Sequence, residues 1–208
     1  MSFIKESNRF YQSLRVDVME TKYAEGELFE KKDFTQIFLQ KGEYEQCTFK
    51  KCDFSNSDLS EIRFGDCTFT ECNLSMASLA NIALQNVTFR NCKMLGMAFK
   101  DLNYLGFNVY FEDCILNQSS FYKAKLGKTT FKNSKLHEVI FSECNLKKSI
   151  FDGCDLFRTA FEQSILEQAD FRTSYNYSIN PDNNRMKKAL FSRDGVVGLL
   201  DQYDIIVE

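Results

Sequence analysis

The sequence predicts an all-β solenoid, in which the chain winds into a square coil and successive coils stack along one axis. Three observations predict it. Large apolar residues recur at every fifth position, small residues recur two positions before them, and polar residues fill the remaining positions. A step of five would scatter side chains around a helix and would alternate them between the faces of a strand. A chain that turns a corner every five residues instead points all of them inward.

The large apolar residues form two unbroken runs, of fifteen and thirteen repeats, separated by a slip of two residues. With four repeats to a coil, they make about seven coils and a rod roughly 34 Å long at ~4.8 Å per coil. The repeat centres, which we expect to be the structural core, are Phe34, Leu39, Tyr44, Phe49, Phe54, Leu59, Phe64, Phe69, Leu74, Leu79, Leu84, Phe89, Met94, Phe99 and Tyr104, then Phe111, Leu116, Phe121, Leu126, Phe131, Leu136, Phe141, Leu146, Phe151, Leu156, Phe161, Leu166 and Phe171.

All eight cysteines of the chain occupy the small position of a repeat. Cys47 and Cys52 with Cys67 and Cys72 have a spacing that suggests a four-thiolate zinc site, but the repeat places the paired residues on different walls of a dry core. Cys52, Cys72 and Cys92 should stack in one column, at a separation beyond the usual Cβ distance of a disulfide. We therefore expect small buried hydrophobic residues, with no metal and no cofactor.

Several repeats carry a family resemblance. Cys52-Asp53-Phe54-Ser55-Asn56, Ser57-Asp58-Leu59-Ser60-Glu61 and Ala169-Asp170-Phe171-Arg172-Thr173 resemble the pentapeptide-repeat family, whose consensus is a small residue, Asp or Asn, Leu or Phe, and two variable polar positions. The resemblance covers roughly residues 32 to 173. It implies a right-handed quadrilateral β-helix.

The sequence disfavours an enzyme, because an interior filled by its own side chains leaves no substrate pocket. The only histidine, His137, follows Leu136 at an outward position and is expected to be a solvated surface residue. No phosphate-binding glycine loop, serine elbow or metalloprotease helix is present. We expect no catalytic, cofactor-binding or metal-binding residue. An enzyme would need a cleft between the tail and the last coil, lined by residues 174 to 195.

Three parts make up the chain: an N-terminal cap over residues 1–31, the β-helix over residues 32–173, and a C-terminal cap over residues 174–208. Phe3, Phe10 and Leu14 have helical spacing, so the first cap is expected to hold a short amphipathic helix. The chain has 44% apolar and 26% charged residues, no run of 18 apolar residues and no secretion signal at its start. These features favour a cytoplasmic protein with no membrane partner.

The tail is expected to contain a short α-helix that begins at Ser192, followed by a strand over residues 205–207. Gly195 and Gly198 would make such a helix unstable alone, so its apolar residues must dock, either on the last coil or on a second copy. The quinolone-resistance members of the family dimerise through a similar C-terminal helix, and this resemblance favours a homodimer. The predicted dimer interface comprises Val196, Val197, Leu199, Leu200 and Tyr203.

The slip between the two runs is a candidate contact site for a partner. It contains the aromatic or apolar residues Tyr104, Leu105, Phe107 and Tyr110, although a tolerated kink in the coil is the favoured interpretation. A second candidate is a lysine cluster, in which Lys128 should lie directly beneath Lys148. A basic strip could hold an anionic partner, but acidic residues nearby favour a mixed solvated surface and no direct binding of nucleic acid.

Two hypotheses of function remain. The first is a non-enzymatic scaffold for protein–protein interaction, homodimeric and cytoplasmic, with an unidentified partner. The second is a protector of DNA gyrase or topoisomerase IV that acts by DNA mimicry, as the resemblance to the quinolone-resistance members implies. Duplex DNA carries one charge per ~1.7 Å, whereas residues 32–171 hold 16 basic against 18 acidic residues, and long projecting loops are missing. The balanced charge and the missing loops both differ from what the second hypothesis requires, and they favour the first hypothesis.

Overall fold

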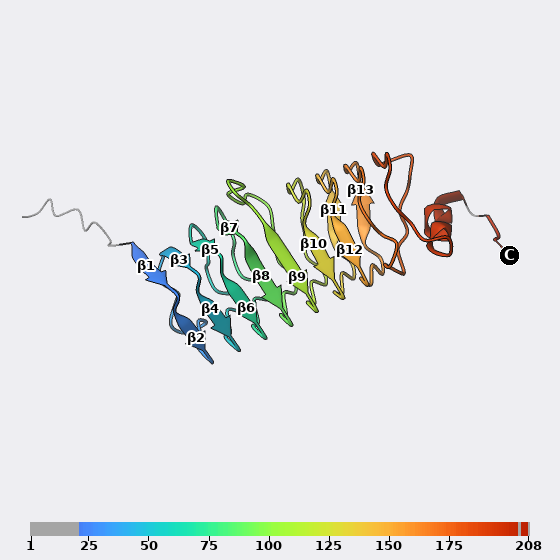
Figure 1. Ribbon diagram of the computed structural model, residues 1–208. Helices are drawn as coiled ribbons and strands as arrows, with labels where there is room; N and C mark the ends of the chain where they lie inside the picture. The colour runs from blue at the N-terminus through green and yellow to red at the C-terminus, as the bar shows by residue number, and fades with distance from the viewer. Residues whose placement is uncertain (1–20, 204, 208) are drawn as a thin grey trace, which may run out of the picture.

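The computed structural model describes residues 21–203 and 205–207, which form one parallel β-solenoid followed by a short tail (Figure 1). The predicted fold class is confirmed. Its strands are β1 (Lys22–Glu25), β2 (Leu28–Glu30), β3 (Gly42–Glu45), β4 (Thr48–Lys50), β5 (Arg63–Gly65), β6 (Thr68–Thr70), β7 (Ala83–Gln85), β8 (Val87–Arg90), β9 (Val109–Glu112), β10 (Thr130–Lys132), β11 (Ile140–Ser142), β12 (Ile150–Asp152) and β13 (Ala160–Glu162). The tail holds two 3₁₀ helices, η1 (Gly195–Leu199) and η2 (Asp201–Tyr203).

The solenoid has four walls, which the chain visits in the order D, A, B, C. Wall A carries a seven-stranded sheet in the order β12-β10-β9-β8-β6-β4-β2, and wall D carries β1-β3-β5-β7. Wall C carries β11 and β13, while wall B is joined by isolated bridges such as Asp53 to Asn73. Each residue pairs in parallel with its equivalent one coil away, as Phe49 does with Phe69. Residues close in space therefore lie one full coil apart in sequence.

The core of wall A is a continuous stack of phenylalanine rings along the axis. Neighbouring rings are 4.7 to 5.3 Å apart between centroids and lie within 21° of parallel. Such burial and stacking stabilise each coil against the next. The other predicted core residues, including Cys52, Cys72 and Cys92, are buried as well, except Tyr104, which is half-buried. The stack comprises Phe29, Phe49, Phe69, Phe89, Phe111, Phe131, Phe151, Phe171 and Phe191.

Polar residues around each centre build the corners. The Asp53 carboxylate accepts a hydrogen bond from the backbone N–H of Ser55 at 2.8 Å, and Asp58 accepts one from Ser60 at 2.9 Å. The residue two positions after the centre then adopts a left-handed backbone, as at Asn56 with φ of 57°. Short polar side chains that bond their own backbone favour such turns. The local chemistry therefore explains why Asp or Asn precedes so many centres.

The two-residue slip lies on wall D. Ala83 bridges to Asn103, whereas Val87 pairs with Val109, so the two extra residues fall between Asn103 and Val109. The side-chain amide of Gln85 donates to the Leu105 carbonyl at 2.9 Å, which closes the widened turn. The coil accommodates the insertion outward, and the ladder on wall A continues without a break.

The two ends differ from the predicted domain limits. Strands β1 and β2 lie inside the segment expected to be a cap, and a bridge from Asp170 to Leu190 extends the ladder beyond residue 173. The pattern fails at these ends because less typical residues occupy them, such as Ala24 opposite Tyr44. The expected N-terminal helix falls mostly on residues 1–20, outside the described residues.

The tail forms 3₁₀ turns instead of the predicted α-helix, and residues 205–207 form no strand. Gly195 and Gly198 pack directly against Tyr177, where an added Cβ would collide with the tyrosine hydroxyl and backbone. This close approach, made possible by glycine, shapes the segment more than its helical capping signals do. In the described part of the chain, no helix has the length and apolar character that a membrane span needs.

Candidate functional site: the surface of wall D

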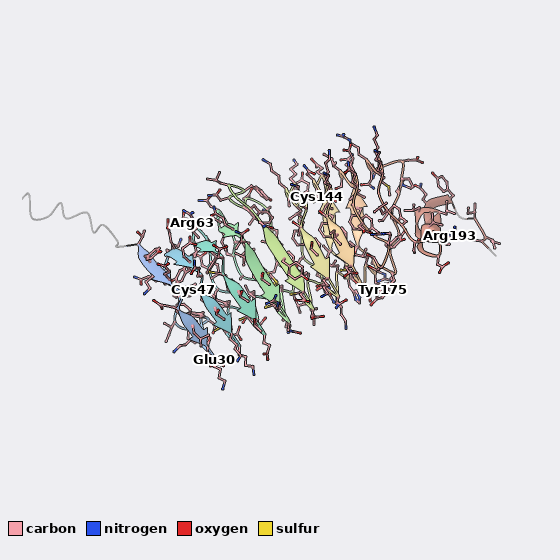
Figure 2. The ribbon with its side chains drawn as sticks, viewed as in Figure 1. Glu30, Cys47, Arg63, Cys144, Tyr175 and Arg193 are labelled. Carbon is pink, nitrogen blue, oxygen red and sulfur yellow. The ribbon has the colours of Figure 1, made fainter. Side chains whose placement is uncertain are left out.

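The interior leaves no room for a ligand in the described part of the chain. The space between core residues such as Leu79, Phe89 and Phe99 amounts to about 10 Å³. A cavity of that size barely holds one water molecule. Recognition is therefore expected on the outer walls and at the ends, where side chains project along the whole rod (Figure 2).

The cysteines link neighbouring coils as hydrogen-bond donors. The Cys154 thiol donates to the Phe131 carbonyl at 3.3 Å, and the Ser164 hydroxyl makes the equivalent bond to Phe141 at 2.7 Å. Burial raises the pKa of Cys154 to about 12, so this thiol is neutral at physiological pH. All eight cysteines are free and buried, and no cluster of metal-ligating residues occurs among the described residues.

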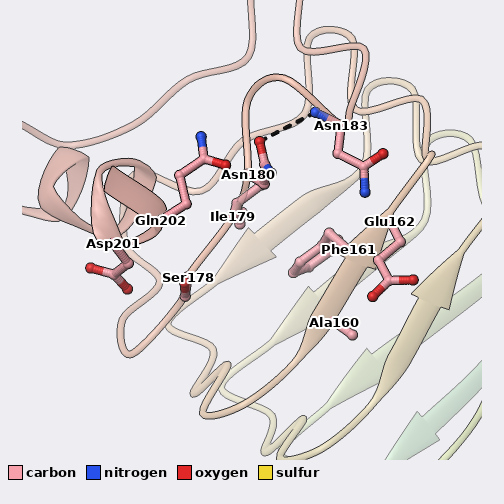
Figure 3. Close-up of a pocket in the computed structure, with 9 residues that line it drawn as sticks. All are labelled: Ala160, Phe161, Glu162, Ser178, Ile179, Asn180, Asn183, Asp201 and Gln202. Carbon is pink, nitrogen blue, oxygen red and sulfur yellow. Dashed lines mark hydrogen bonds between the residues drawn. The ribbon is translucent and has the colours of Figure 1, made fainter. Parts of the chain in front are cut away.

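Two hollows lie where the tail meets the last coils, at the place that an enzyme would require. One, of about 410 Å³, contains Tyr177, whose buried hydroxyl has no hydrogen-bond partner in the described structure. The other, of about 340 Å³, has Phe161 at its centre, and the Glu162 and Asp201 carboxylates lie on opposite sides of it (Figure 3). Neither arrangement pairs a nucleophile with a base in the way that covalent catalysis needs.

His137 differs from its predicted solvated state. Its Nε2 atom lies 2.8 Å from the Asp155 carboxylate, which also accepts a hydrogen bond from Asn176 at 2.9 Å. Burial opposes ionisation of Asp155, but hydrogen bonds from Asn176 and His137 hold its pKa below the usual value. This pair ties two coils of wall B together, which is a structural role.

The slip residues do not all lie on the same wall. Tyr104 and Phe107 are half-buried on wall D and pack edge to face, with ring centroids 5.4 Å apart. Leu105, which lies between them in the sequence, is 78% exposed. Tyr110 belongs to β9 on wall A, beside Thr130. The predicted contact set therefore splits, and Leu105 is its projecting member.

The C-terminal half of wall D is strongly basic, and we call it the basic half. Glu167 is its one carboxylate, and it accepts from Arg185 at 2.6 Å and lies 3.3 Å from the Lys147 ammonium. Hydrogen bonds from these two cations lower the pKa of Glu167. Lys128 and Lys148 have no carboxylate partner among the described residues. The cations of the basic half are Lys125, Lys128, Lys147, Lys148, Arg185, Lys187 and Lys188.

The N-terminal half of the same wall has the opposite charge, and we call it the acidic half. Glu43 and Glu45 lie on β3, within 3.7 and 3.9 Å of Arg63, which is the cation on β5. Glu25 and Asp66 add two further carboxylates to these coils, and Lys22 on β1 is a second cation, so four carboxylates share this half with two cations. Wall D is therefore divided by charge, with the Leu105 projection near the boundary.

Comparison with known proteins agrees with this architecture. A family model described as "Pentapeptide repeat region" matches residues 43–105 and 107–177. The comparison with curated proteins gave no match. Among solved structures, full-length QnrB1, a plasmid-mediated fluoroquinolone resistance protein, aligns with a TM-score of 0.60 at 16% identity, over 88% of this chain and 100% of that chain.

A trypsin-treated form of QnrB1 aligns with a TM-score of 0.58 at 17% identity, over 90% of this chain and all of that chain. HetL, from the cyanobacterium Nostoc sp. strain PCC 7120, aligns more weakly, with a TM-score of 0.35 at 12% identity over 90% of this chain and 93% of that chain. At these identities the likeness to QnrB1 concerns the fold.

Proposed function

Because the chain belongs to the pentapeptide-repeat family, we propose that it is a non-enzymatic, cytoplasmic scaffold whose wall D binds another protein. The observation that carries the proposal is the exposure of Leu105, whose side chain is 78% exposed on wall D. An exposed apolar side chain flanked in the sequence by two aromatic residues that pack on each other offers an anchor for a partner. The filled interior leaves the outer surface as the place for recognition.

Site-specific cross-linking tests this proposal. A photoreactive amino acid at position 105 is expected to form a protein adduct in cells, and excess unlabelled protein should compete with the adduct. The same amino acid at Ala80, an exposed position on wall C, is the matched control. Adducts at neither position, or equally at both, would contradict binding through wall D.

We also propose that the tail forms a homodimer. Leu199 packs against the core of its own chain, whereas Val196 and Val197 are 43% and 41% exposed. Tyr203 is half exposed, and its hydroxyl donates to Asp182 at 2.8 Å. An exposed apolar patch at the end of the rod fits a second copy of itself. Light scattering should give twice the monomer mass for the wild type and the monomer mass for a V196D/V197D variant. A wild-type monomer at micromolar concentration would exclude this dimer.

A second candidate function is protection of a type II topoisomerase from fluoroquinolones. The whole-length fold similarity to QnrB1 favours it. Charge argues against simple mimicry of DNA, because a duplex is uniformly negative whereas wall D has a basic half. Gyrase supercoiling, measured with and without a fluoroquinolone, decides the question. Rescue of supercoiling by the added protein would support this function. If the protein neither rescues nor inhibits supercoiling, this function is eliminated.

A further inference from the structure

We propose that the basic half of wall D is a docking site for a short acidic segment of a protein partner. The inference rests on the proposed function, since it names the chemistry of the partner that the same wall would bind. Seven cations share this surface with one carboxylate, Glu167, which is already held by Lys147 and Arg185. The remaining positive charge has no counterpart among the described residues of this surface.

The backbone presents these lysines in an ordered row. Lys128, Lys148 and Lys188 occupy the same position of the repeat, and all three have a left-handed backbone, with φ of 68°, 62° and 60°. Their side chains therefore leave the wall from equivalent backbone positions, with Gln168 in the intervening coil. Such a row is preorganised by the solenoid, and its order does not depend on a partner.

The size of the basic half favours a short ligand. Three coil spacings separate Lys128 from Lys188, which is about 14 Å at ~4.8 Å per coil. An extended peptide advances ~3.3 Å per residue, so four or five residues would span the row. A peptide of about six acidic residues would therefore cover the basic half and reach its edges.

The acidic half of the wall disfavours larger polyanions. A nucleic acid duplex lying along the wall would leave the basic half after about four base pairs, at 3.4 Å per pair. About four coil spacings, or ~19 Å, beyond Lys128 it would meet Glu43 and Glu45, which lie beside Arg63, as would an anionic bilayer resting on this face. Repulsion from the acidic half therefore selects a short anionic segment. The exposed Leu105 at the boundary could hold an apolar residue next to that segment.

Binding of a labelled hexaglutamate peptide, measured by fluorescence anisotropy, tests the proposal. The wild type is expected to bind the peptide, and raising the salt from about 0.05 to about 0.3 M should weaken binding, because the charges are exposed. A K128A/K148A/K188A variant should bind roughly tenfold more weakly, given three surface charge pairs of modest strength. Circular dichroism would verify that the variant is folded.

The matched control removes the same charge from other walls. A K31A/K93A/K135A variant alters three exposed lysines on walls A and B and should bind within about twofold of the wild type. Equal weakening by both variants would mean that only net charge matters and would overturn the proposal. So would the absence of peptide binding, or tighter binding of duplex DNA or phosphatidylserine vesicles than of the peptide at the same lysines.

The outcomes separate this inference from the proposed function. Cross-linking at position 105 without lysine-dependent peptide binding would rule out the acidic segment as the ligand but would keep the proposal that the protein is a scaffold. Peptide binding without cross-linking at position 105 would support the basic binding site but would rule out the proposal that wall D binds a partner protein in cells.

Discussion

The phenylalanine stack of wall A predicts a large and position-dependent loss of stability on truncation. Phe131 lies in the middle of the stack, is fully buried, and has its ring centroid 5.0 Å from those of both Phe111 and Phe151. It also meets Phe121 and Phe141 edge to face, at 6.0 and 5.9 Å. Replacement by alanine would remove all four aromatic contacts and leave a cavity between two coils.

The expected cost for F131A is about 4 to 5 kcal/mol of unfolding free energy, at the upper end of the range for buried phenylalanine because of the four ring contacts. The control is F191A at the end of the stack, where the ring is half-buried, stacks on Phe171 at 5.3 Å and meets only one further ring, Tyr177 at 5.7 Å. It should cost about 2 kcal/mol or less, since fewer contacts and less buried area are lost.

Urea unfolding followed by far-ultraviolet circular dichroism measures both values. Each coil of a solenoid interacts chiefly with its neighbours, so an internal coil has two interfaces to lose and a terminal coil has one. Equal losses for F131A and F191A, or a loss below about 1 kcal/mol for F131A, would refute the role of the stack in holding the coils together.

Three further results are expected. L136D should lower the thermal midpoint by unfolding the adjacent coils, because an unpaired carboxylate in a dry core costs several kcal/mol; an unchanged midpoint would contradict the inward position. C154S should change the unfolding free energy by less than about 1 kcal/mol, because a serine hydroxyl makes the same inter-coil hydrogen bond at other small positions of the repeat. The wild-type Cys154 thiol should resist thiol reagents at pH 8 until the protein unfolds, because its raised pKa keeps it neutral. Hydrogen bonds from Lys132 and Arg90 lower the pKa of Glu112 in the folded state, so the stabilising contribution of Glu112 is present above its unfolded pKa and is lost as pH falls through its folded pKa. E112Q should therefore flatten the acid side of the profile of thermal midpoint against pH. Identical profiles for E112Q and the wild type would contradict this linkage.

The five-residue period was sufficient to predict the solenoid and its inward residues. An inward direction depends on the corner that each repeat makes with its own residues, such as Asp53 bonding to Ser55. That geometry is local, so a sequence pattern reveals it. The same reasoning located the two-residue slip, because an insertion shifts the pattern by a countable amount.

The ends and the tail required the three-dimensional structure. The ladder includes β1 and β2, although Ala24 replaces a large centre in β1, because pairing of β1 with β3 and of β2 with β4 supplies the backbone partners. The tail adopts 3₁₀ turns because two glycines fit against Tyr177, a contact between segments that no local capping signal encodes. In each case a neighbour far along the chain determines the local conformation.

The tertiary structure also decided which charges share a surface. Along the sequence, Lys148 is followed closely by Asp152, and a linear window mixes their signs. The coil places Asp152 on wall A, while Lys128 and Lys148 gather on wall D with Lys188. Inward positions follow from each repeat alone, but outward neighbours are set by stacking one coil on the next. The sequence by itself therefore determined the solenoid and its core, whereas the division of wall D into a basic and an acidic half came only from the register between coils.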